Sequence, residues 1–419
     1  MDSQISLQQP ILNGGIRSIN FFNGRLLSAR DLTREQTAQR EADRRLGQAV
    51  GEGIAYGLEL SKATASTNES PVITVEAGLA VNRNGQALML ADKTEVALVR
   101  RASTGSSGAQ MFSECLPLQT GTYIAGAGVY LLTIAPAQGV EGRAITNGLD
   151  TATAACNTDT LVNAVQFRLI QLDQQITAAE IQDQNHLRNA IAYKCFGVNS
   201  ASTFAADPFN TKLDKYGLLD DLRPTWLSDC DVPLGILFWT LVDGLKFIDM
   251  WSVRRRLARR LVDKNWPFLT SERTTREGEA MYLQFQNQLK DLTGFGLTLS
   301  QVRARDHFGH LPAAGFLPIG GPGGFDYATF FNEMTFRQPI FIEGAQLRPL
   351  FQEAFEYPPI DTGSGVVVWL YVVRENAQTS LSPAVGGATQ SYMVFASGHT
   401  PYRGEARYDV HHWDFGNFS

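Results

Sequence analysis

The sequence contains no apolar run long enough to cross a membrane. The longest mainly apolar stretch, Val232 to Val242, ends at Asp243, whereas a helical span needs about 20 residues. The amino terminus, Met1 to Ile5, lacks both the basic start and the apolar stretch of a secretory signal. These absences predict a chain without a membrane span that is made and assembled in the cytoplasm.

An excess of positive charge is also missing. The formal net charge is -6, whereas a general nucleic-acid binder carries a basic face or stripe. Hydrophobic residues make up 44% and charged residues 19% of the chain, which is far from the composition of disordered proteins. We therefore expect a folded protein that has no nucleic acid among its partners.

Cysteine is scarce and widely spaced. Cys115, Cys156, Cys195 and Cys230 form no Cys-x-x-Cys pair and have no histidine at zinc-ligand spacing. We expect all of them to be ordinary buried or surface thiols.

Sequence motifs of catalysis are absent as well. No Gly-x-Ser-x-Gly elbow occurs, and Gly126 and Gly128 precede a predicted strand instead of following one, which is the wrong context for a phosphate-binding loop. His307 and His310 lie near Asp306 without a further ligand beside them, so a polar turn is the better interpretation. The sequence predicts no enzyme, with no catalytic residue, no metal site and no cofactor.

What is present is a chain of 419 residues, longer than the roughly 250 to 300 at which single cores stop growing. Turn-rich segments divide it into an N-terminal segment and helix (1–60), a β-rich domain (61–200), a linker-like segment (201–230) and a second, mixed β-rich domain (231–419). The predicted fold class is α+β and β-rich, with antiparallel sheets or β-sandwich-like regions and a few peripheral helices.

Runs of β-branched and aromatic residues between turn signals predict the strands. The turn at Asn82 to Gly85 and the hairpin turn at Asp243-Gly244 separate neighbouring strands, and the strands nearest the amino terminus form a predicted β-meander. Helices are predicted over 178–193 and 272–292. The predicted strands are 72–75, 78–81, 88–90, 96–99, 129–135, 164–172, 234–242, 246–249, 366–373 and 392–396.

A further helix is predicted from Ala29 to Val50. Ser28 stands at the N-cap position with Asp31 three residues later, and charges of both signs alternate along the segment. Leu32 and Leu46 belong to a thin apolar stripe, which is typical of a helix at a domain edge and less often of one that pairs with a neighbouring subunit. Both leucines are candidate assembly contacts.

Two later segments provide further candidates. Arg254, Arg255 and Arg256 form either the charged face of a helix or a salt-bridging surface for an acidic neighbouring subunit. The Pro- and Gly-rich segment 311–324 excludes regular structure, yet its apolar side chains, Phe316 among them, need a pocket. We therefore expect an ordered loop that packs on its own domain or on a neighbour.

Five groups of residues between 23 and 361 also carry a resemblance to a known family. They are Asn23-Gly24-Arg25-Leu26-Leu27 with Asp31-Leu32 and Glu35-Gln36; Val232-Pro233-Leu234; Ile248-Asp249 with Val253-Arg254-Arg255-Arg256; Leu311-Pro312 to Leu317-Pro318; and Tyr357-Pro358-Pro359-Ile360-Asp361. Together they resemble a family of baseplate-associated proteins, cage- or collar-like, from phage-tail-like contractile injection systems of bacteria.

The resemblance implies a structural role at the baseplate and spike end of such a particle, in several copies and without an enzymatic step. The implied partners are other baseplate, spike or sheath proteins of the particle and further copies of the chain. The particle itself is either released or membrane-anchored. The alternative function is a β-rich receptor- or glycan-binding protein displayed on the particle, for which aromatic residues such as Tyr402, Trp413 and Phe415 would suit sugar stacking.

Overall fold

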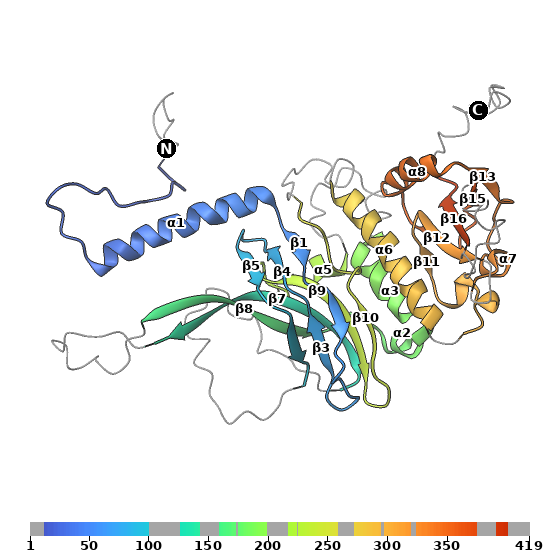
Figure 1. The fold of residues 1–419 in the computed structure, drawn as a ribbon, viewed down its shortest axis with the longest axis horizontal. Helices are drawn as coiled ribbons and strands as arrows, with labels where there is room; N and C mark the ends of the chain where they lie inside the picture. The colour runs from blue at the N-terminus through green and yellow to red at the C-terminus, as the bar shows by residue number, and fades with distance from the viewer. Residues whose placement is uncertain are drawn as a thin grey trace, which may run out of the picture.

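The computed structural model describes residues 12–99, 126–142, 159–172, 175–198, 217–223, 225–258, 272–294, 297–319, 324–374 and 391–400. Within these ranges the fold is α+β and β-rich, with mainly antiparallel sheets. Figure 1 shows an elongated molecule in which two sheet-containing lobes lie on either side of a central pair of helices. A long helix near the amino terminus projects from one end.

The first lobe holds three antiparallel sheets, with strand orders β1-β4-β5, β2-β3-β6 and β10-β9-β7-β8. The last of these is the largest, and its two longest strands extend beyond the rest of the lobe (Figure 1). The strands are β1 (Gly53–Gly57), β2 (Leu60–Lys62), β3 (Val72–Val75), β4 (Gly78–Val81), β5 (Ala87–Leu90), β6 (Thr94–Ala97), β7 (Gly128–Glu141), β8 (Thr160–Gln171), β9 (Val232–Thr240) and β10 (Gly244–Asp249).

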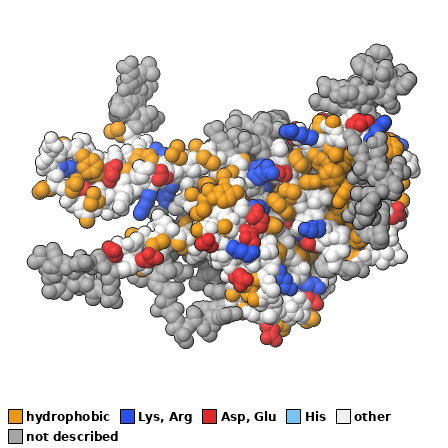
Figure 2. All heavy atoms as spheres, in the orientation of Figure 1, with side chains coloured by type: hydrophobic (Ala, Val, Ile, Leu, Met, Phe, Trp, Pro, Cys, Tyr) orange, Lys and Arg blue, Asp and Glu red, His pale blue; other side chains and the backbone are white. Residues whose placement is uncertain are grey.

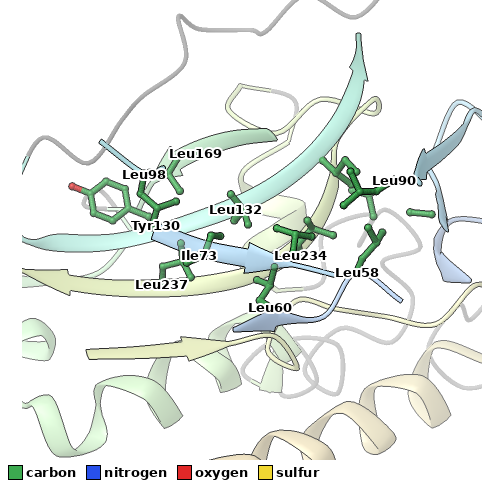
Figure 3. Packing of buried hydrophobic residues seen from close by; sticks show 14 of the residues in the cluster. Leu58, Leu60, Ile73, Leu90, Leu98, Tyr130, Leu132, Leu169, Leu234 and Leu237 are labelled. Atoms are coloured by element: carbon green, nitrogen blue, oxygen red, sulfur yellow. The ribbon is translucent and has the colours of Figure 1, made fainter. Parts of the chain in front are cut away.

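The side chains of β7 contribute to two cores, because successive residues of a strand point to opposite faces of the sheet. Tyr130 and Leu132 face the core shared with the two smaller sheets (Figure 3), where they pack among residues such as Ile73. Val129 and Leu131 face the opposite core, which lies under the helices. Both faces are therefore buried, which explains why the strand is almost continuously apolar in the sequence.

Strand β9 changes faces at a bulge. Val232 and Leu234 belong to the first core, whereas Ile236 belongs to the opposite one. The pairing of β7 with β9 shifts so that Leu234 has no partner on β7, as expected for the extra residue of a bulge. The bulge therefore reverses the alternation, so that Leu237 and Trp239 face the first core after it.

The second lobe is built around a four-stranded sheet of order β12-β16-β15-β13, in which only β13 and β15 are parallel. A short antiparallel pair, β11 and β14, lies beside it. The elements are η2 (Leu299–Gln301), η3 (Ala304–Asp306), β11 (His310–Leu311), β12 (Ala314–Ile319), α7 (Tyr327–Phe330), β13 (Ile340–Ile342), η4 (Gly344–Gln346), α8 (Leu347–Ala354), β14 (Ile360–Asp361), β15 (Val368–Val373) and β16 (Ser391–Ser397).

Both faces of this second sheet are covered as well. Leu370 and Phe395 pack with Phe285 of helix α6 (Glu272–Gly294), while Tyr371 on the other face packs with Leu350 of α8. The apolar run of β15 therefore has the same origin as that of β7.

Helices α3 (Gln184–Phe196) and α6 form the contact between the lobes. These two helices are therefore central, whereas the sequence predicted peripheral ones. Helix α3 covers the large sheet of the first lobe, and α6 covers the sheet of the second. They pack together through alanine, aromatic and methionine side chains: Ala192, Tyr193, Phe196, Ala280 and Met281. Two short helices, α2 (Ala178–Gln182) and α5 (Leu218–Asp221), complete the helical layer beside α3.

Two predictions about chain organisation are wrong. The boundary expected at residue 231 cuts a continuous sheet, because β9 pairs with β7 along its length. The predicted meander is divided as well: β4 and β5 form the expected hairpin, but β3 pairs with β2 and β6 in a different sheet. Both the domain boundary and the division of the meander depend on which strands pair. The composition along the chain does not predict that pairing.

The Pro- and Gly-rich segment is also more regular than expected, since Ala314–Ile319 forms β12. Pro318 is tolerated because β12 is an edge strand. The carbonyl of Pro318 accepts from Phe325 N at 2.9 Å, so this residue's backbone polar groups point away from β16 and the missing N–H breaks no pair. The expected packing is confirmed, because Leu311 and Leu317 are fully buried. Residues 320–323 lie outside the described ranges.

One cysteine differs from the expected plain thiol. Cys230 is buried and disulfide-bonded, whereas Cys195 is a buried free thiol whose pKa is raised by burial to about 12. Cys115 and Cys156 lie outside the described residues. The prediction is wrong for Cys230 because spacing in the sequence does not reveal which cysteines meet in space.

Candidate assembly surface

Residues 12–50 form a projecting element that we call the arm. Its helix α1 (Ala29–Val50) begins with the predicted capping box: Asp31 N donates to Ser28 Oγ, and Ser28 N donates to the Asp31 carboxylate at 3.0 Å. The hydrogen bonds from Ser28 lower the pKa of Asp31 to about 2. The helix start is thus fixed by local sequence alone.

The preceding segment, residues 12–28, runs back along α1. Ile19 N donates to Glu35 Oε2 at 3.0 Å, and Arg45 Nη2 donates to the Gly14 carbonyl at 2.6 Å. These contacts give the arm two layers of chain, yet of the α1 side chains only Ala38 is buried. The arm is therefore thin and has almost no core of its own.

The arm joins the body at two glycines in close backbone contact. The backbone of α1 at Gly47 lies directly against the turn at Gly85, where a side chain on either residue would collide with the other segment's backbone. Gly85 also has a φ of +79°, which favours glycine. This crossing holds the carboxyl end of the helix on the β4–β5 hairpin while the other end projects (Figure 1).

Exposed apolar side chains are concentrated on the arm. Of the eighteen large hydrophobic residues that are exposed in the described ranges, nine belong to residues 12–50. The candidate contacts Leu32 and Leu46 are among them, 52% and 68% exposed. The sequence pointed to these two but missed the others: Leu12, Ile16, Phe21, Phe22, Leu26, Leu27 and Val50. For Leu26 and Leu27 the available signal was their position directly before the helix cap at Ser28.

A second projecting element is the outer part of the β7–β8 pair, which we call the ribbon. Residues 135–141 of β7 pair only with residues 160–166 of β8, because β9 ends its pairing at Ile134. A two-stranded ribbon is at best marginally stable alone in water. Figures 1 and 2 show the arm and the ribbon extending to the same side of the body, with open space between them.

The arginine cluster lies elsewhere and is not helical. Residues 254–258 are extended beside β1, with Arg255 O accepting from Ile54 N at 2.9 Å. Arg254 is buried and donates to the carbonyls of Gly57 and Leu58, which supports the positive φ of both residues. The prediction of a charged helix face is wrong because these backbone groups pair with β1.

The other two arginines also have partners within the chain. Arg255 donates to the carbonyls of Trp251 and Ser252 and lies over the Phe196 ring, 5.0 Å from its centroid. Arg256 forms an ion pair with Glu279 of α6, N to O 2.6 Å. Of the three, only Arg256 keeps a largely exposed side chain, so it is the one that remains available to a neighbouring subunit.

Phe316 also has partners inside its own lobe. Its ring stacks on Phe351 with centroids 4.8 Å apart and meets Tyr282 edge-on. The side chain is half-buried between β12 and α8. The expected pocket therefore exists and is supplied by the protein's own second lobe.

The two lobes are joined by a buried polar cluster around Arg188. Its guanidinium donates to Asp249 at 3.0 Å, to Asp291 at 2.6 Å and to Asn287 at 2.6 Å. Burial opposes the charge of Arg188, but the two carboxylates outweigh it and raise the pKa. The cluster ties α3 to β10 and α6, so the body offers a stiff support for the arm and the ribbon.

His310, one of the two histidines weighed as possible ligands, has a structural partner. The His310 ring stacks on Tyr193 with centroids 4.9 Å apart, and burial lowers its pKa. In the described part of the chain no three His, Cys, Asp or Glu side chains gather closely enough to hold a metal ion. No helix there is long and apolar enough to span a bilayer. The aromatic residues considered for sugar stacking, 402, 413 and 415, lie outside the described ranges.

Comparisons with known proteins add no family to these observations. No protein-family model matches the chain, and no curated protein matches it.

Proposed function

We propose that this chain is a structural, non-catalytic component of a phage-tail-like contractile injection system, located at the baseplate or spike end and acting through subunit contacts. The observation that supports this most directly is the arm, which carries half of the exposed large apolar side chains of the described residues. Monomeric proteins rarely expose so many large apolar side chains in one region, and such regions mark interaction sites.

The body supports the same function. The buried cluster at Arg188 and the helix pair α3–α6 hold the lobes together, which suits a structural component of a particle. The disulfide at Cys230 fits a protein that reaches an oxidising environment, where disulfides persist, and therefore favours a particle that leaves the cell. Partners are other baseplate, spike or sheath proteins of the particle.

The test is incorporation into particles. An affinity tag is placed on this chain in its native host, and particles are isolated by density and viewed by cryo-electron microscopy. We expect the tagged chain at one end of the particle, and particles from a deletion strain with that end incomplete. Intact particles of normal structure from the deletion strain, or a chain that never sediments with particles, would overturn the proposal.

A further inference from the structure

The distal half of the arm, residues 12–34, combines apolar and basic side chains. Seven of the nine exposed apolar residues of the arm lie here. The same segment has four arginines and one aspartate, a net charge of +3, whereas residues 35–50 are neutral. Arg30 and Arg34, one helical turn apart, are exposed and make no ion pair with any part of the chain that the structure describes. This surface attracts a partner that is both apolar and acidic.

The ribbon has the complementary character. Val140 and Leu161 are direct cross-strand partners and so lie on the same face, and both are exposed. The only charged residues in 135–142 and 159–166 are Glu141 and Asp159, a net charge of -2. An apolar pair flanked by two carboxylates matches what the distal arm presents.

Within one chain the two surfaces are separated by open space (Figure 2). We infer that the distal arm of one copy docks on the β7–β8 ribbon of a second copy of this chain. The inference rests on the proposed function, since it names the partner of an assembly protein. The chain outside residues 12–50 carries a net charge of -9, because the whole has -6 and the arm +3, so a second copy attracts the arm at long range as well.

A second copy covers both the distal arm and the ribbon. A single anionic partner would cover only the distal arm. An acidic membrane or an acidic protein would bind the arginines but would leave the carboxylates and apolar pair of the ribbon uncovered. A contact between two different patches is heterologous, and repeated contacts of this kind close into a ring or continue as a filament. The arm–ribbon contact therefore generates the several copies that a collar needs.

The experiment is sedimentation velocity of the purified full-length chain over a range of concentrations, with two charge-reversal variants. One carries Arg30→Glu and Arg34→Glu, and the other carries Glu141→Arg and Asp159→Arg. Each places like charges on both contact surfaces, so each should weaken self-association at least about tenfold. Val242→Asp, at an 82% exposed apolar position in the β9–β10 turn, is the control and should associate like the wild type.

Mixing the two variants is the decisive step. In a 1:1 mixture the acidic arm of one meets the basic ribbon of the other, and the basic arm meets the acidic ribbon. We expect association to return to within about threefold of wild type. A mixture that stays monomeric, or a ribbon variant that associates normally, overturns the arm–ribbon contact.

The outcomes for this contact and for the proposed function are separable. A wild-type chain that remains monomeric, while the tagged chain still incorporates into particles, overturns the self-contact and leaves the function standing. A chain that self-associates as expected but never enters particles supports the contact and overturns the function.

Discussion

The arm and the body use the same residue types in opposite ways. In the body, phenylalanine and arginine are buried and partnered: Phe285 contacts the rings of Phe308 and Phe395, and Arg188 lies between two carboxylates. On the arm, Phe22 is exposed and Arg30 has no ionic partner among the residues described. The body is stabilised by its own contacts, whereas the arm displays groups that only another molecule can cover.

A matched pair of phenylalanine truncations tests this contrast with the largest expected effect. Phe285→Ala should lower the free energy of unfolding by about 3–5 kcal/mol, because a fully buried ring is replaced by a cavity. Phe22→Ala on the arm should change it by less than about 0.5 kcal/mol. Urea unfolding followed by fluorescence measures both. A similar loss in the two variants would show that the arm has a core after all.

Two arginines give the next comparison. Arg188→Met should cost about 3 kcal/mol, since it leaves Asp249 buried without its cation. Arg25→Met removes the ion pair with Asp31 on the arm and should cost less than about 1 kcal/mol. Thermal unfolding at neutral pH measures both. If Arg188→Met unfolds like the wild type, the cluster does not hold the lobes together.

Cys230, which forms a disulfide, is a buried residue of the body. Cys230→Ser should lower stability by about 2–4 kcal/mol. In the denatured, unreduced wild type, an alkylating reagent should label two of the four cysteines by mass spectrometry, because one disulfide occupies the other two. Four labelled cysteines would contradict the disulfide.

The glycine crossing determines how the arm and the body are joined. In an isolated helix Gly47→Ala would stabilise by about 1 kcal/mol, but here the added methyl group collides with the backbone at Gly85. We expect a net loss of about 1–3 kcal/mol, together with faster hydrogen exchange at residues 82–86 and in the last turn of α1. Exposed Ala49→Gly in the same turn is the control and should leave exchange at 82–86 unchanged. Unchanged exchange in Gly47→Ala would mean that the arm is not anchored there.

The smallest effect is expected at the arm's stripe. Leu46→Ser should leave the stability of the free chain within about 0.5 kcal/mol of the wild type, because the side chain is 68% exposed. Its effect should appear instead as weaker incorporation into particles. A clear loss of stability in the free chain would place Leu46 in an intramolecular contact.

The sequence by itself determined the local elements. The capping box at Ser28 fixed the start of α1. Short, mainly apolar runs between turns fixed β3 and β4 to the residue, because the interactions that decide these features lie within a few positions of one another. The same local rules indicated Leu32 and Leu46 as exposed positions of a thin stripe.

Only the tertiary structure decided which distant segments meet. It paired β9 with β7 across the expected domain boundary, buried Arg254 against the carbonyls of Gly57 and Leu58, and formed a disulfide at Cys230. It also left the arm and the ribbon uncovered on the same side of the molecule (Figure 1). These outcomes depend on free energies summed over contacts between residues far apart in the chain, which neither periodicity nor composition records.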